Sequence, residues 1–282
     1  MNAGALESIR AKLALGSVIP YLGPGVLSME EGSSNLPATQ AVLAGCLTAK
    51  SNVPFKLKTN LGAAAQFIEN FKHRRTVTAA MTEALRLEAK PAELHRFLRN
   101  LPKLPLIVHT WYDDLPQKTL KSRASWGMVQ GVSQAEHFGN WFHYFSSEGN
   151  RIEPEGAKEA DNWETLLYQP LGSVWPAQNY LVSDSDFVEV LTEIDIQTPI
   201  PQQVQRLREG RSFLFLGCRF QTQMERQFAR QIIKRSSDKH WAIFPESVTR
   251  NEERFLEEAN IERVDITLSE FVREIGSERV VS

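Results

Sequence analysis

The chain has 282 residues, of which 42% are hydrophobic, enough to bury the core of one large domain or of two modest ones. Its 32 basic and 34 acidic residues nearly balance, so its charge gives no reason to expect a nucleic-acid partner. Two cysteines cannot form a four-cysteine zinc module, and no apolar run approaches the ~20 residues that span a bilayer. We therefore expect a cytoplasmic protein without zinc and without membrane association.

The first third of the chain predicts a helix, a buried strand and then more helices. Apolar residues with helical spacing near the start are followed by Gly16, which is placed to end that helix. Within the next segment, SVIPYLGPGVL, residues 18–22 predict a short buried strand. The long segment NLGAAAQFIENFKHRRTVTAAMTEALRLEA has helical periodicity, and a shorter helix follows it. We expect a helical insertion at about residues 30–100.

The middle of the chain combines a second strand with an aromatic-rich segment. The apolar run Leu106–Thr110 follows a proline and predicts the strand. Residues from about 118 to 165 contain a charged loop and an aromatic cluster, which consists of Phe138, Trp141, Phe142, Tyr144 and Phe145. We expect this segment to be a second insertion, packed on the sheet. If it is exposed, it is a candidate surface for a protein partner.

The last third alternates helices with short apolar strands. Ser185 is placed as the N-cap of a helix whose buried face contains Phe187, Val190, Leu191 and Ile194. The segments SFLFLG, HWAIF and RVDIT predict three strands, separated by helical segments. Such alternation is typical of a parallel sheet that is buried on both faces. We expect a Rossmann-like α/β fold with helices on both faces, as one domain over residues 1–282 that carries the two insertions.

Glycines stand at the ends of two predicted strands. Gly23 and Gly25 flank Pro24 directly behind the first strand, and Gly217 ends the segment SFLFLG. Glycine in this place either lets the backbone turn sharply or lets a ligand such as a phosphate approach closely. In α/β sheets, ligands bind beyond the carboxyl ends of the strands, where the topology reverses. A turn and a nucleotide site both remain open.

Six segments follow one another in a specific order. YLGPGVL and AAAQFIENF are followed by IVHTWYDDL and QPLGSVWPAQNYLVSDSDFVEVL, then by FLFLGCRF and the closing pair HWAIF and RVDIT. This order resembles that of the sirtuin-like NAD-binding family, in particular its divergent bacterial branch without the zinc module. The corresponding family segments contain G-A-G-x-S, Ala-Gln-aromatic, T-N-Y-D and Leu-His-Gly-Ser. The similarity spans about residues 16–275 and implies a site for NAD or ADP-ribose.

The resemblance implies that this nucleotide contacts the loops behind the strands. The implied binding residues are Gly23, Pro24, Gly25, Val26, Thr110, Trp111, Asp113, Gly172, Gly217, Cys218 and Arg219. Arg219 follows a strand-end glycine and is placed to pair with a phosphate. Asp113 matches the aspartate that supports the family's nucleotide pocket, but it equally fits a turn or a helix cap.

Two positions depart from the family's catalytic pattern. Trp111 stands where the family has the asparagine that orients the ribose and the attacking water, and Leu171 replaces the histidine that acts as general base. Indole offers one N–H donor and leucine offers nothing to a proton, so this catalysis is absent there. Leu27 also takes the place of the serine in the glycine loop. His109 is either a replacement base or an ordinary buried histidine. No residue is assigned as catalytic or as a metal ligand.

Three functions are consistent with this pattern. The first is a protein that binds NAD or ADP-ribose without turning it over, in a sensing or adaptor role. The second is an NAD glycohydrolase that uses other residues to release nicotinamide. The third is an interaction protein whose pocket is empty because the Trp111 indole fills it. Deacylation is disfavoured, since both the zinc module and the histidine are missing. The sequence does not indicate an oligomeric state.

Overall fold

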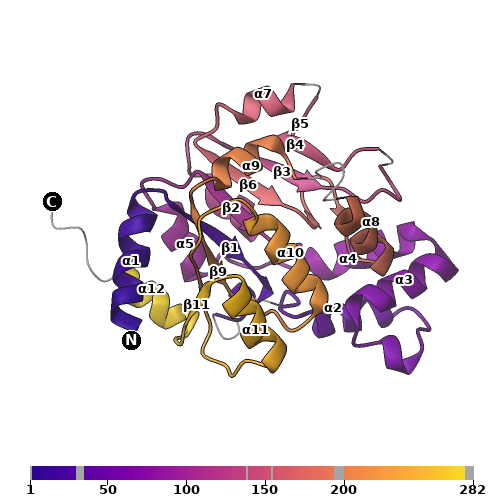
Figure 1. Cartoon of the computed structure of the whole chain (residues 1–282). Coiled ribbons are helices and arrows are strands. Elements are labelled where there is room, and N and C mark those ends of the chain that lie inside the picture. Colours follow the sequence, from indigo (N-terminus) through magenta and orange to yellow (C-terminus); the bar gives the residue numbers. More distant parts are fainter. Residues whose placement is uncertain (1, 30–34, 138, 154, 194–199, 277–282) are drawn as a thin grey trace.

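A mixed β-sheet forms the centre of the molecule (Figure 1). The computed structural model describes residues 2–29, 35–137, 139–153, 155–193 and 200–276. In these ranges the sheet consists of β1 (Val18–Leu22), β2 (Leu106–His109), β3 (Trp126–Gly131), β4 (Phe142–Ser146), β5 (Arg151–Ile152), β6 (Thr165–Gln169), β9 (Ser212–Leu216), β10 (His240–Ile243) and β11 (Ile261–Val264). Their spatial order is β11-β10-β9-β1-β2-β6-β3-β4-β5. The strands from β11 to β3 are parallel, whereas β4 and β5 are antiparallel additions.

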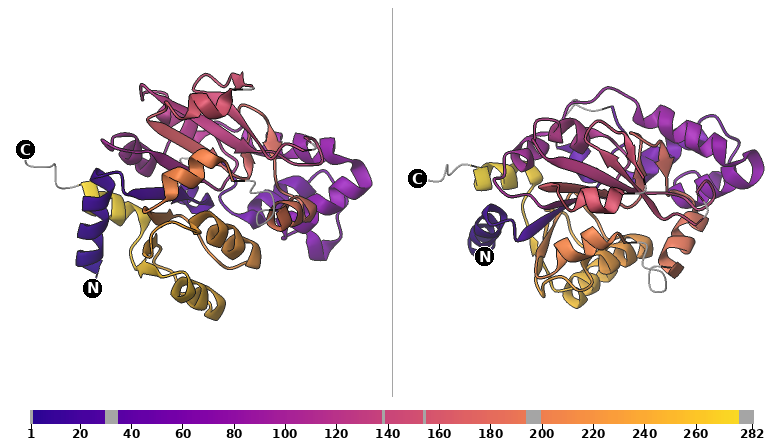
Figure 2. Two further views of the ribbon diagram at one scale, coloured as in Figure 1. Left: turned by 45° about the horizontal axis from the view of Figure 1, so that its top comes forward. Right: turned by 90° about the horizontal axis from the view of Figure 1, so that it is seen from above.

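Helices cover both faces of this sheet (Figures 1 and 2). One face carries α1 (Asn2–Ala14), α5 (Glu93–Arg99), α6 (Leu115–Leu120) and α12 (Leu268–Gly276). The other face carries α7 (Gly156–Ala160), α9 (Gln202–Arg208), α10 (Gln223–Ile233) and α11 (Arg250–Glu258). Side chains alternate along β1. Val18 and Leu22 belong to the core beneath α1, α5, α6 and α12, whereas Ile19 and Tyr21 belong to the core beneath α7, α9, α10 and α11. The predicted Rossmann-like α/β fold is confirmed.

A helical block lies at the end of the sheet where β1 and β2 terminate. It consists of α2 (Gln40–Thr48), α3 (Leu61–Lys72) and α4 (Arg74–Leu85), with the short 3-10 helix η2 (Phe55–Leu57). Its apolar residues form a third core with Leu27, Trp111 and Tyr112, which follow β1 and β2. The long helix predicted here is broken at His73, whose φ of 69° ends α3 before α4 begins. The helical block therefore covers the carboxyl edge of the sheet.

The aromatic-rich segment is part of the main sheet. Residues 118–165 contain β3, β4 and β5, and β4 includes three members of the predicted aromatic cluster. Tyr144 and Phe145 are buried, while Trp141 and Phe142 pack against the core from a half-buried position. Phe138 lies outside the described residues. Tyr144 therefore belongs to the core on one face of the sheet and Phe145 to the core on the other face.

The ends of several elements differ from the sequence-based expectation. The helix assigned to an N-cap at Ser185 is α8 (Asp184–Glu193), and its first turn is capped by Ser183, whose hydroxyl accepts from the Asp186 N–H. Ile194, expected on the buried face of that helix, lies outside the described residues. The last strand begins two residues earlier than the segment RVDIT, at Ile261. Gly16 ends α1 as predicted, with a positive φ of 69°.

Candidate ligand cavity

A cavity of about 320 Å³ opens at the carboxyl ends of β1, β2 and β9. Strands β2 to β6 lie on one side of β1 in the sheet, whereas β9, β10 and β11 lie on its other side. The topology therefore reverses at β1. The sheet and the loops behind it contribute Tyr21, Gly23, Pro24, Thr110, Trp111, Tyr112, Leu171, Cys218, Arg219, Phe220 and Thr222. The surrounding helices and their connections contribute Gln40, Thr59, Asn60, Leu61, Gly62, Asp184, Phe187, Met224, Glu225 and Phe228.

The glycines behind β1 and β9 allow these two loops to contact each other. A Cβ on Gly23 or Gly25 would lie 2.5 Å or 2.8 Å from the Gly217 carbonyl oxygen. Gly217 itself has φ +66°, and a Cβ there would lie 2.4 Å from the Val26 nitrogen. Real Cβ atoms do not approach backbone atoms this closely. The contact between the two loops is therefore sufficient to require glycine at these positions, without any ligand.

The N–H groups of the loop behind β1 already have acceptors. Gly23 donates to the Leu216 carbonyl and Gly25 to the Gly217 carbonyl, each at 2.9 Å. Val26 donates to the Gly23 carbonyl at 3.3 Å, and Pro24 has no N–H. A phosphate-binding loop needs N–H groups that point at the ligand. From Gly23 to Val26, this loop offers none.

The segment behind β2 places Thr110 and Trp111 in the cavity wall. The Thr110 N–H and hydroxyl both donate to the Leu22 carbonyl, at 2.8 Å and 3.0 Å. Trp111 is 3% exposed, and its indole N–H donates to the Pro37 carbonyl at 2.9 Å. The indole belongs to the core of the helical block. Trp111 therefore walls the cavity without filling it.

Leu171 and Gly172 follow β6, on the side of the cavity near α8. Leu171 is half-buried and presents an apolar side chain to the cavity. Gly172 does not line the cavity; it lies in β7 (Gly172–Ser173), which pairs with β8 (Asn179–Tyr180). Its φ is +79°, and a Cβ would lie 2.1 Å from the Asn179 carbonyl oxygen. This glycine is needed for the β7–β8 pairing.

His109 and Asp113 form a buried pair outside the cavity. Their side chains meet at 3.1 Å between Nε2 and Oδ2, and both are nearly inaccessible to solvent. The other His109 ring nitrogen faces the Gln169 amide, while Asp113 also accepts from the Leu115 N–H. Burial raises the pKa of Asp113, but His109, His95 and the Leu115 N–H together bring this pKa below its ordinary value. His109 is a satisfied core histidine, and Asp113 accepts from the first N–H of α6.

Arg219 lines the cavity, but its guanidinium is paired with a carboxylate. Two of its nitrogens donate to the two oxygens of Glu252, each at 2.9 Å, and one also donates to the Ser247 carbonyl. Glu252 is completely buried and also accepts from the Thr249 and Phe220 N–H groups. This bidentate pair joins the loop behind β9 to the first turn of α11.

Two carboxylates that the sequence analysis did not select also line the cavity. Glu225 lies in the first turn of α10, where it accepts from the Thr222 N–H at 2.8 Å and from the Gln40 amide at 3.1 Å. Asp184 is the first residue of α8, and its carboxylate lies against Gly62 in the first turn of α3. Burial raises the pKa of both groups. Acidic residues at helix starts are usually caps, which is why the sequence drew no attention to them.

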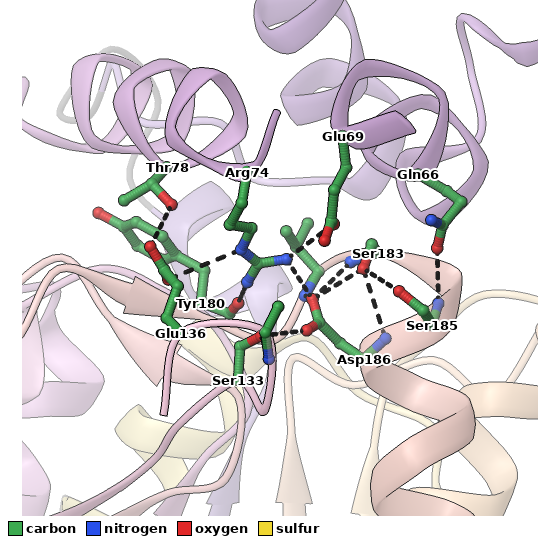
Figure 3. A network of polar contacts seen from close by, with 12 residues as sticks. Gln66, Glu69, Arg74, Thr78, Ser133, Glu136, Tyr180, Ser183, Ser185 and Asp186 are labelled. Carbon is green, nitrogen blue, oxygen red and sulfur yellow. Dashed lines mark hydrogen bonds and ion pairs between the residues drawn. The ribbon is translucent and has the colours of Figure 1, made fainter. Parts of the chain in front are cut away.

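An ion-pair network around Arg74 fixes α8 against the helical block (Figure 3). The Arg74 guanidinium donates to Asp186 at 2.7 Å and to Glu69 at 3.1 Å, and it also contacts Glu136 and the Tyr180 carbonyl. Asp186 is buried and accepts further bonds from the backbone at the start of α8. Because α8 carries Asp184 and α3 carries Gly62, this network holds two walls of the cavity in place.

The structure thus brings together part of the predicted site. Gly23, Pro24, Thr110, Trp111, Cys218 and Arg219 line the cavity. Gly25, Val26, Asp113, Gly172 and Gly217 do not. Burial raises the pKa of the Cys218 thiol, which keeps it neutral.

The described ranges contain no cluster of three His, Cys, Asp or Glu side chains suited to a metal ion. Every helix in them is too short or too polar to cross a membrane.

Comparison with known proteins assigns a family. A solved structure described as "Structural Basis for the Mechanism and Regulation of Sir2 Enzymes" aligns with 97% of this chain and 96% of its own, at 11% identity and a TM-score of 0.43. No curated protein matches the sequence. Residues 105–264 match the family model of the SIR2-like domain. Because this match covers more than half of the chain, the protein belongs to the SIR2-like domain family.

Proposed function

We propose that this SIR2-like protein binds NAD or a closely related ligand in the cavity behind β1, β2 and β9, and does not cleave it. The position supports binding, because ligands of open α/β sheets bind where the topology reverses. The volume, about 320 Å³, is at the lower end of the roughly 300–1,000 Å³ of pockets for drug-sized ligands. The cavity therefore accommodates part of a dinucleotide, and the remainder extends into solvent.

We infer that the ligand is not cleaved because Trp111 and Leu171 occupy the two positions where the family has its catalytic groups. Trp111 offers one donor, which the Pro37 carbonyl already occupies, and Leu171 offers neither donor nor acceptor. His109, the alternative base, is paired with Asp113 outside the cavity. Hydrolysis needs a base within reach of the attacking water, and neither position supplies one. A sensing or adaptor role follows from binding without turnover.

One observation favours the second candidate function, an NAD glycohydrolase. The Glu225 carboxyl lines the cavity, and burial raises its pKa, which is the direction that suits a general base near neutral pH. Against this function, Glu225 already accepts bonds from Thr222 and Gln40 in a helix cap. If it were the base, Glu225→Gln would abolish nicotinamide release.

The test is calorimetric titration with NAD, run beside chromatography for released nicotinamide. We expect saturable binding to the wild-type protein and no nicotinamide above the buffer blank. Leu171→Trp fills the cavity and should abolish binding, whereas Leu15→Trp, at a position that is 68% exposed and outside the cavity, should not change it. Binding that survives Leu171→Trp would place the ligand elsewhere. Nicotinamide release that depends on Glu225 would establish the glycohydrolase instead.

A further inference from the structure

Strand β11 forms one end of the sheet, and its outer edge is open (Figure 1). The His240 N–H donates to the Asn260 carbonyl, so every second residue counted from Asn260 bonds to β10. Ile261 and Arg263 alternate with these residues and therefore direct their N–H and C=O groups outward. Within the described residues, no strand pairs with β11 from this side. The edge thus offers two donors and two acceptors to a further strand.

A groove of about 470 Å³ is lined by residues of this edge and of α11. Helix α11 precedes β11 in the chain and packs against it. Leu256 of α11 and Ile261 of β11, both nearly buried, give the groove an apolar floor. Ile261 belongs to the core beneath α11, and Arg263 lies on the same face because side chains alternate along a strand. A strand added to the edge would therefore place every second side chain in the groove.

Two carboxylates of α11 also line the groove. Glu253 and Glu257 are exposed and four residues apart, and within the described residues neither side chain has a hydrogen bond or an ion pair. Lys239 and Arg263, the cationic residues of the groove, each form an ion pair with an acidic residue. The unbalanced charge of the groove is therefore negative, which favours a basic ligand.

The spacing of the two carboxylates matches that of alternate residues in a strand. Four residues of an α-helix rise by about 6 Å. Two residues of a strand advance by about 6.6 Å. Basic residues at positions i and i+2 of an added strand can therefore each approach one carboxylate, while their aliphatic stems cover Leu256 and Ile261.

A second copy of this chain does not suit the edge. Residues directly opposite each other in an antiparallel pair have side chains on the same face, which limits the registers that a two-fold axis allows. Each such register that overlaps three residues of β11 places Glu262 opposite Glu262 of the other copy, or Arg263 opposite Arg263. Like charges directly opposite each other are destabilising. The occupant of the edge is therefore a different chain.

From these observations we infer that the edge of β11 and the groove beside α11 bind an extended basic segment of another protein, which adds a strand to the sheet and directs two Lys or Arg side chains to Glu253 and Glu257. In this mode the main-chain hydrogen bonds provide affinity and the alternate side chains provide specificity. Of the described residues, none lines both this groove and the ligand cavity, so the inference does not depend on the proposed function.

Separate variants test the charge and the backbone. Glu253→Gln and Glu257→Gln each remove one negative charge from the groove. The matched control is Glu159→Gln, because Glu159 is an exposed glutamate of α7 outside the groove whose side chain has no partner among the described residues. Arg263→Pro removes an outward N–H, which an edge strand tolerates, whereas Arg263→Ala removes the same side chain and keeps the N–H.

The experiment measures by calorimetry how two capped peptides, Thr-Arg-Val-Arg-Val-Thr and Thr-Glu-Val-Glu-Val-Thr, bind to the whole chain. We expect saturable binding of the arginine peptide and at least about tenfold weaker binding of the glutamate peptide. Glu253→Gln and Glu257→Gln should each weaken binding of the arginine peptide by about two- to fivefold, and Glu159→Gln should not change it. Arg263→Pro should bind it at least about tenfold more weakly than Arg263→Ala. Thermal denaturation shows which variants are folded, and the glutamine variants decide the test if Arg263→Pro is not.

Three results would overturn the inference. The first is the absence of saturable binding by the arginine peptide, or equal binding of both peptides. The second is binding of the arginine peptide that neither glutamine variant weakens, which would place the peptide elsewhere. The third is a dimer in analytical ultracentrifugation that Arg263→Pro abolishes and Arg263→Ala preserves, which would assign the edge to a second copy.

Discussion

The contact between the loops behind β1 and β9 leads to a prediction about two glycines with nearly the same backbone conformation. Gly217 has φ +66° and Gly210 has φ +68°, so alanine pays the same left-handed penalty at both, roughly 1–2 kcal/mol. Their surroundings differ. A Cβ on Gly217 would lie 2.4 Å from the Val26 nitrogen, whereas a Cβ on Gly210 would meet nothing within 4 Å. Comparing the two variants therefore isolates the contact between the loops.

The extra cost at Gly217 follows from the distance that the loops must separate. An ordinary Cβ contact begins at 3.4 Å, so Gly217→Ala moves the loop behind β1 by about 1 Å. The bond from the Gly25 N–H to the Gly217 carbonyl is 2.9 Å long and would break. A buried donor left without an acceptor costs about 1–3 kcal/mol. We expect Gly210→Ala to lower the free energy of unfolding by about 1–2 kcal/mol, and Gly217→Ala by about 2–5 kcal/mol.

Urea denaturation followed by circular dichroism measures both free energies. The gain in stability from restricting the unfolded chain is the same for the two glycine-to-alanine changes and cancels in the comparison. The expected difference is at least about 1 kcal/mol. Equal losses in the two variants would refute the reasoning, because they would mean that the loops do not approach closely at Gly217.

Three further predictions concern other parts of the chain. Burial raises the pKa of Glu252, but the paired Arg219 and the N–H donors bring this pKa to about 2. The lowered pKa contributes about 3 kcal/mol to the stability of the folded state at neutral pH. This contribution should be lost as the pH falls from about 4.5 to 2. Urea denaturation across that range should show this loss, and Glu252→Gln should flatten it. Neither Trp111→Asn nor Leu171→His alone should release nicotinamide from NAD, since the groups act as a unit; release by either single variant would contradict the assigned cavity. Arg74→Met leaves the buried Asp186 carboxylate unpaired and should cost about 3–5 kcal/mol in thermal denaturation, and an unchanged melting temperature would refute this role.

The central strands could be predicted because their burial is uniform. All residues of β1, β2 and β9 are buried, so each strand is a short apolar run bounded by glycine, proline or polar residues. The edge of the sheet formed by β4 and β5 could not be predicted in this way. In β4, only the three middle residues are buried, and aromatic residues lie on both sides of the strand. This pattern resembled a cluster packed on the sheet, although the strand is part of it.

The sequence indicated which loops lie at the cavity, but it did not indicate the charged side chains that line it. The loops follow from the order of strands, because parallel strands bring their carboxyl ends to one edge. The partner of Arg219 is 33 residues away in sequence, so that only the tertiary structure shows that its charge is balanced. Asp184 and Glu225 stand in the first turns of helices, where an acidic residue has an ordinary explanation as a cap. Their common position on the cavity wall depends on how α8 and α10 pack.

The retained glycines and the lost phosphate donors have one physical cause. Where the end of β9 and the loop behind it contact the loop behind β1, the Leu216 and Gly217 carbonyls accept from the N–H groups of Gly23 and Gly25. The same contact excludes side chains at these positions, so glycine is required whether or not a phosphate binds. Substitutions of Gly25 would therefore reduce stability without reporting on the ligand. Information on the ligand comes instead from Glu225, which lines the cavity and whose charge Glu225→Gln removes while its capping hydrogen bond is kept.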